Sequence, residues 1–129
     1  ISACLVGSEM CIRDRGQEVF RRAVRAVASS CAAALDRAGV AAADVALFVP
    51  HQANLRIIEA ATARLGIPLD RCAIVIEETA NTSAASVPLA LAAAVSDGRV
   101  SSGDAVLMCG FGAGLTWATA VLRWGTPGD

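Results

Sequence analysis

The chain has 129 residues and a formal net charge of −1, which supports one domain with its own core and argues against non-specific nucleic-acid binding, since that needs a positive field. Its five cysteines are an odd number without a C-x-x-C pair, and no apolar run approaches 18 residues, so we expect a cytoplasmic protein with no disulfide framework, metal site or membrane segment. Apolar residues make up 55% of the chain and charged residues 18%, which indicates a surface partly covered by a partner.

The first fifteen residues do not share the pattern of those that follow. Residues 1–15 show no sustained apolar period. They look like translated sequencing-adapter read-through fused to a truncated gene. We therefore expect residues 1–15 to be a non-native leader and residues 16–129 to form the domain.

The next part of the chain alternates between helical and strand patterns. From Gln17, apolar residues recur at helical spacing until Gly39 supplies a stop. The unbroken apolar run 45–49 is typical of a parallel strand that is buried on both faces. Helical spacing returns over residues 52–65 and ends at Gly66.

The alternation continues to the end of the chain. Residues 72–76 are predicted to form a second buried strand, and residues 83–96 an Ala-rich helix that tolerates Pro88 only near its first turn. Residues 105–109 and 115–122 are predicted to be strands joined by a glycine-rich turn. The order α-β-α-β-α-β-β predicts an α/β fold, with a mostly parallel sheet covered by helices and an antiparallel edge.

Polar residues follow the predicted strands, where parallel α/β sheets bind ligands. His51, the only histidine, precedes a predicted helix whose macrodipole disfavours the imidazolium form, and a neutral ring could donate a hydrogen bond to an oxyanion. From its position alone, a structural role is somewhat favoured, since a lone histidine is more often a structural polar residue. Asn81 offers an amide donor, although it could, with Thr82 and Ser83, simply cap the next helix. The turn 110–114 presents backbone N–H groups to a ligand.

Three segments resemble the C-terminal signatures of the β-ketoacyl-[acyl-carrier-protein] synthase III family. They are PHQANLRI, NTSAASVPLA and FGAGLTWATAVLRW, and GQEVF from Gly16 also resembles that family. The similarity covers roughly residues 16–124 and implies most of the second half of a thiolase-type, five-layered αβαβα fold. It also implies a cytoplasmic homodimer that needs no cofactor. Its reaction is decarboxylative Claisen condensation of an acyl-CoA primer with malonyl-acyl-carrier protein, which initiates fatty-acid biosynthesis.

The resemblance implies roles for particular residues. His51 and Asn81 match residues that donate hydrogen bonds to the thioester oxygen while malonyl decarboxylation builds an enolate. A backbone N–H within Gly112, Ala113 and Gly114 would complete the oxyanion hole that serves the acylated cysteine.

Further residues match positions around the substrate. By resemblance, Asn54 lies near the pantetheine arm and Phe111 lines the mouth of the pocket. Arg56 and Arg64 would form a patch that docks the acidic acyl carrier protein, the alternative being solvated surface arginines.

The chain departs from the family pattern in three respects. Ala80 and Ala113 stand where the family usually has glycine, and alanine does not freely take a positive φ. The family's nucleophilic cysteine belongs to the other half. Cys31, Cys72 and Cys109 lie in apolar patterns typical of inert core thiols. We therefore expect the chain to need its N-terminal half, which bears the catalytic cysteine, to complete condensation.

Two alternatives stay open on the sequence. One is a related polyketide or quinolone-type starter condensing enzyme, which would use the same histidine and asparagine. The other is a non-catalytic half that only binds carrier protein or CoA. The missing half, which shapes the acyl pocket, would distinguish them.

Overall fold

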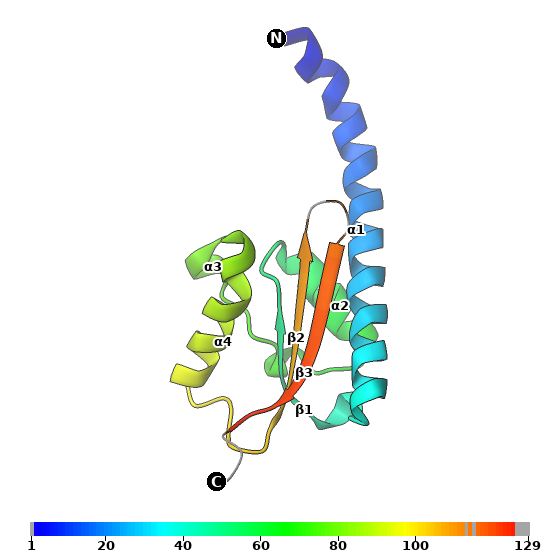
Figure 1. The fold of residues 1–129 in the computed structure, drawn as a ribbon. Coiled ribbons are helices and arrows are strands. Elements are labelled where there is room, and N and C mark those ends of the chain that lie inside the picture. Colours follow the sequence, from blue (N-terminus) through cyan, green and yellow to red (C-terminus); the bar gives the residue numbers. More distant parts are fainter. Residues whose placement is uncertain (1, 113, 115, 126–129) are drawn as a thin grey trace.

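The protein is described here by a computed structural model that covers residues 2–112, 114 and 116–125. Within these residues a three-stranded sheet has the order β1-β2-β3, with β1 at Val45–Pro50, β2 at Ala105–Gly112 and β3 at Thr116–Arg123. β2 pairs in parallel with β1 and antiparallel with β3. The predicted parallel pairing and antiparallel closing edge are both confirmed (Figure 1).

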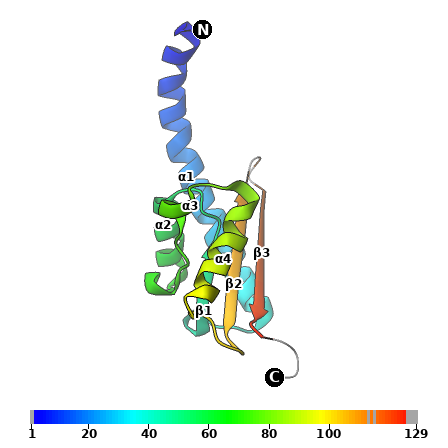
Figure 2. The ribbon, with the colours of Figure 1, turned by 90° about the vertical axis from the view of Figure 1, so that its left-hand side faces the viewer.

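Helices cover both faces of this sheet (Figure 2). α1 and α2 pack against one face and α4 packs against the other. The helices are α1 at Ser2–Ala38, α2 at Leu55–Leu65, α3 at Ile76–Thr79 and α4 at Ser86–Ser96. Short 3-10 turns lie at Ala42–Asp44, Leu69–Arg71 and Ser83–Ala85.

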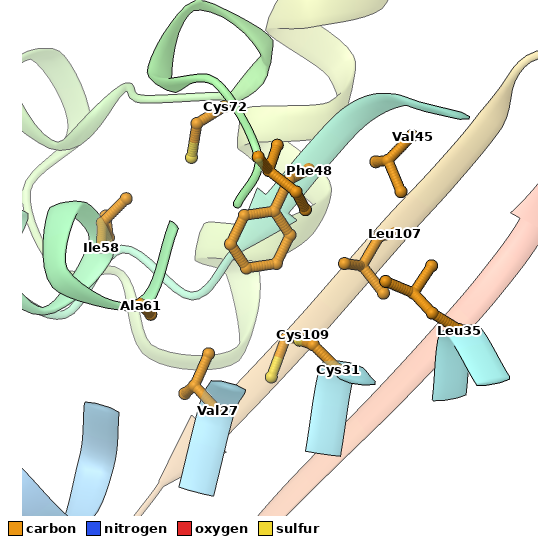
Figure 3. Packing of buried hydrophobic residues seen from close by; sticks show 11 residues of the cluster. Val27, Cys31, Leu35, Val45, Phe48, Ile58, Ala61, Cys72, Leu107 and Cys109 are labelled. Carbon is orange, nitrogen blue, oxygen red and sulfur yellow. The ribbon is translucent and has the colours of Figure 1, made fainter. Parts of the chain in front are cut away.

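Successive side chains of a strand point to opposite faces of the sheet, so the core residues divide between these two faces. Along β2, Leu107 and Cys109 join the cluster beneath α1 and α2, whereas Val106 and Met108 join the cluster beneath α4. Phe48 of β1 lies fully buried at the centre of the first cluster (Figure 3). The central strands are therefore apolar on both faces, as their unbroken runs predicted.

Helix α1 begins at Ser2, not near Gln17 as the sequence pattern predicted. Its first turns extend away from the sheet in both views (Figures 1 and 2). The backbone of residues 2–15 thus continues the helix without lying against the sheet. The origin of residues 1–15 as a non-native leader stays a prediction.

The predicted strand 72–76 is wrong, because this segment makes only an isolated parallel bridge between Cys72 and Phe48. The Gln52 side chain occupies the backbone groups that a longer ladder would use. Its Nε2 donates to the Ala73 carbonyl (3.1 Å), and its Oε1 accepts from the Val75 N–H (3.0 Å). The chain then turns into α3 at Ile76.

The other helix boundaries are set by local interactions, and some of them differ from the predicted boundaries. Helix α2 starts three residues later than predicted because Asn54 is its N-cap, and its side chain accepts from the Arg56 N–H. Helix α4 starts at Ser86, which places Pro88 in the first turn, as predicted. Gly66 ends α2 with a φ of 71°, in the left-handed conformation expected of a stop. Among the described residues, no helix is long and apolar enough to cross a membrane.

Candidate active site

A groove of about 1120 Å³ opens at the carboxyl ends of β1 and β2. It brings together His51, Asn81 and Phe111, which the sequence analysis had selected from three separate loops. The other residues that line it are Val19, Ala53, Ser83, Ala84, Val87, Gly110, Gly112, Gly114, Thr116, Trp117 and Ala118. The expectation that these loops share one edge of the sheet is confirmed.

His51 is fixed in the groove by its backbone and by its ring. Its N–H donates to the Cys109 carbonyl oxygen (2.7 Å), which ties the residue after β1 to β2. Its Nδ1 lies 2.5 Å from the Ser86 hydroxyl oxygen, and its ring centroid lies 6.4 Å from that of Phe111. The ring is therefore held between α4 and the end of β2.

Burial lowers the pKa of His51 below its ordinary value. The neutral ring expected from the sequence is therefore supported, but its cause differs. Helix α2 begins only at Leu55, after the N-cap Asn54, so His51 precedes the first turn, where the macrodipole acts most strongly.

Asn81 lines the groove from a strained loop. Its Oδ1 accepts from the Ser83 N–H (3.0 Å), which leaves the Nδ2 hydrogens as donors. The N-cap residues of the 3-10 turn and of α4, Thr82 and Ala85, make no side-chain cap bond. The Asn81 contact does satisfy the first N–H of that 3-10 turn, so the capping role considered from the sequence is met through Oδ1 and leaves the Nδ2 donors available. Ala80 and Ser83 both have a φ of 53°, and such strain persists where the surroundings enforce it, often at functional sites.

Two buried polar residues behind His51 were missed by the sequence analysis. Gln52 is fully buried and also donates to the Pro50 carbonyl (2.8 Å), so it joins the loop after β1 to the segment before α3. Ser86 is fully buried too, and its hydroxyl accepts from the Gln52 N–H (3.2 Å). The available signal was a polar residue adjoining His51 and a hydroxyl at the start of an Ala-rich helix.

The remaining predicted site residues divide into two groups. Gly112 and Gly114 line the groove, whereas Ala113 lies outside the described residues. Asn54, Arg56 and Arg64 are exposed on α2 or at its start and are not among the described residues that line the groove. Eight residues separate the two arginines, which is roughly 12 Å along a helix axis.

The prediction that Cys31, Cys72 and Cys109 are core thiols is confirmed, since all three are buried. Burial raises the pKa of Cys72 to about 11. A hydrogen bond with Cys109 raises the pKa of Cys31, and the same contact lowers the pKa of Cys109 against the effect of burial. Cys109 is only 1% exposed and faces α1 rather than the groove, so it is not placed to accept an acyl group.

A mixed sheet between helices, with His51 and Asn81 at one groove, is the arrangement of one half of a thiolase fold. The chain belongs to the family described as 3-oxoacyl-[acyl-carrier-protein (ACP)] synthase III C terminal, whose model matches residues 35–124.

Relatives of known name agree with this family. The β-ketoacyl-[acyl-carrier-protein] synthase III of Roseiflexus castenholzii is 54% identical over 109 residues, which are 84% of this chain and 33% of the relative. The crystal structure of the Thermus thermophilus synthase III superposes with a TM-score of 0.82 at 55% identity, covering 85% of this chain and 34% of that one. The chain thus spans about a third of the length of these relatives.

A second similar structure comes from a polyketide pathway. It is the priming β-ketosynthase of the R1128 polyketide biosynthetic pathway, with a TM-score of 0.79 and 48% identity over 84% of this chain and 33% of that one. The chain is thus about equally similar to a synthase III and to a priming ketosynthase of a polyketide pathway.

Proposed function

We propose that this chain is the decarboxylating half of a β-ketoacyl-[acyl-carrier-protein] synthase III. The observation that carries the proposal is the pair His51 and Asn81, which line the same groove. The protein engages one polar atom of each side chain: Nδ1 of His51 lies against the Ser86 hydroxyl, and Oδ1 of Asn81 accepts from the Ser83 N–H. Their remaining N–H groups are the donors that a developing thioester oxyanion needs.

The chemistry follows from these donors. Loss of CO₂ from a malonyl thioester leaves an electron pair that delocalises onto the thioester oxygen as an enolate. Fixed neutral donors stabilise that charge without supplying a proton that would quench the carbanion. Removing one such donor typically lowers the rate about 10²- to 10³-fold.

The substrates and partners in this proposal are those of the whole enzyme. Acyl-CoA acylates a cysteine of the N-terminal half, malonyl-acyl-carrier protein supplies the enolate, and two copies form a cytoplasmic dimer without a cofactor. The names of the relatives support acyl carrier protein as a partner, and the one-third span of the match supports a separate N-terminal half. By itself the chain holds the donors but not the acyl acceptor.

The test uses a hybrid in which residues 16–125 replace the matching segment of the Roseiflexus castenholzii synthase. We expect His51→Ala and Asn81→Ala each to lower malonyl decarboxylation about 10²-fold or more, while mass spectrometry still detects acylation of the cysteine. Glu59→Ala, an exposed change on α2, serves as the control and should leave both steps unchanged. If decarboxylation survives both substitutions, the chain is a carrier-binding half and the proposal is wrong.

A second candidate is the priming of polyketide synthesis, favoured by the similarity to the R1128 synthase. The same two donors would serve it, so variants of this half do not separate the two pathways. Acyl-CoA primers of different length and branching, offered to the enzyme with its native N-terminal half, would separate them. A preference for acetyl-CoA would support initiation of fatty-acid synthesis.

A further inference from the structure

We propose that Ser86 is a positioning residue that fixes the ring tautomer of His51, with Nδ1 as the acceptor and the Nε2–H directed to the substrate. The inference deepens the proposed function and depends on it for its catalytic meaning. Ser86 itself touches no substrate in this proposal, because it is fully buried behind the imidazole.

The hydrogen-bond count at the Ser86 hydroxyl sets its direction. The oxygen lies 3.2 Å from the Gln52 nitrogen, which can only donate, and 2.5 Å from Nδ1 of His51. Among the described residues it has no other hydrogen-bond partner. A hydroxyl carries one proton. Donating that proton to Nδ1 satisfies every group, whereas an Nδ1–H would leave the buried hydroxyl proton without an acceptor, at a desolvation cost.

The Gln52 N–H is itself held rigidly. The side chain of Gln52 bonds to the backbone of Pro50, Ala73 and Val75, so its backbone cannot easily turn away from Ser86. The direction of the Ser86 hydroxyl is thus set by a buried network that spans the loop after β1, the segment before α3 and the start of α4. Such partners behind a functional imidazole fix its tautomer and ring orientation.

A serine suits this position better than the carboxylate that often stands behind a catalytic histidine. A carboxylate accepts from Nδ1–H and raises the pKa of the ring. A hydroxyl that donates to Nδ1 instead opposes protonation of that atom. Among the described residues that line the groove, His51 is the only titratable side chain, so no neighbouring charge there counteracts this effect.

The test reads the tautomer directly. The chain contains one histidine, so ¹⁵N NMR of the full chain labelled at histidine reports His51 alone. The same spectrum is taken on the hybrid, where His51→Gln identifies the signal. We expect a proton on Nε2 and none on Nδ1 at neutral pH. A protonated Nδ1 in the unsubstituted protein would overturn the proposal whatever the variants do.

Variants of Ser86 then test whether this residue positions the His51 ring or only supports the fold. Ser86→Ala should mix the two tautomers, raise the pKa of His51 and move the acid limb of the decarboxylation pH profile upward, with a rate loss of roughly tenfold. Ser86→Thr, which keeps the hydroxyl, should restore the tautomer, the pKa of His51, the pH profile and the rate. Ser30→Ala is the control, because it removes a part-buried hydroxyl that bonds Thr119 instead of His51. An unchanged tautomer and pKa in Ser86→Ala would contradict the inference.

The outcomes distinguish this inference from the proposed function. If NMR shows the expected tautomer but His51→Ala retains decarboxylation, the network is correct and the catalytic role of His51 is wrong. If His51→Ala abolishes decarboxylation but Ser86→Ala leaves the tautomer and pH profile unchanged, the catalytic role of His51 is correct and the positioning role of Ser86 is wrong.

Discussion

Ala80 adopts a backbone conformation that alanine rarely takes, with a φ of 53° and a ψ of −162°. Its N–H still bonds the Ile76 carbonyl (2.9 Å) as α3 ends, so the turn is formed despite the methyl group. The next residue is Asn81, whose amide lines the groove. The strain is therefore located where the chain must change direction to present this donor.

The first prediction is that Ala80→Gly stabilises the protein. Glycine adopts this conformation freely, and relief of strain should exceed the entropy that glycine adds to the unfolded chain, for a net gain of ~1 kcal/mol. Urea unfolding of the hybrid would measure it. The matched change Ala92→Gly, at an exposed position within α4, should instead cost about 1 kcal/mol. Equal losses in both variants would show that Ala80 carries no strain.

The residues that face the groove were predictable, and the residues behind them were not. His51 directly follows the buried strand β1, Asn81 lies a few residues after the apolar segment 72–76, and the family motifs include both of them. Ser86 is 35 positions from His51 in the chain, and no periodicity or spacing pairs a hydroxyl with a ring across that separation. Only the packing of α4 against the loop after β1 brings the two together.

At the scale of elements, prediction succeeded where apolar periodicity coincides with the core and failed where a side chain replaces a backbone partner. β1 and β2 are pure core, and their runs predicted them within a few residues. The segment 72–76 is equally apolar, but the Gln52 amide takes the place of a neighbouring strand. A sequence pattern records burial and cannot show which group fills the hydrogen bonds of a buried backbone.

Helix α2 carries the prediction that belongs to this scale. Arg56 and Arg64 are both exposed on it, and an acidic carrier protein would meet them as rim charges. In the hybrid, Arg56→Glu combined with Arg64→Glu should raise KM for malonyl-acyl-carrier protein roughly tenfold, because like charges then oppose docking. Turnover of malonyl-CoA should stay unchanged.

The control for this prediction is Arg37→Glu, the same charge change at an exposed residue in the last turn of α1. Its effect on KM should be small. An equal rise in KM for all three arginine positions would show that net charge, and not a docking patch on α2, governs the interaction.

On the scale of the whole molecule, the two faces of the sheet are covered unequally. α1 and α2 together close one face, and the cluster beneath them is continuous (Figure 3). The other face carries α4, on which Leu89 and Val95 remain 42% and 38% exposed. Trp117 of β3, which pairs with Phe111 on the face of α1, is 50% exposed in the groove wall. We expect the second half of a thiolase fold to cover the side that carries α4.

The last prediction follows from that exposed apolar surface. Expressed alone from Gly16, the chain should self-associate, since large apolar patches are buried by association when no partner is present. Light scattering after size-exclusion chromatography would measure the mass. Leu89→Lys with Val95→Lys should shift it toward the monomer, whereas Leu69→Lys, a similarly exposed apolar residue on the 3-10 turn Leu69–Arg71, should not. If the unsubstituted chain is instead a monodisperse, cooperatively melting monomer, the exposed apolar residues of α4 and β3 need no covering partner. The only remaining reason to expect a second half would then be the nucleophilic cysteine that the chain lacks.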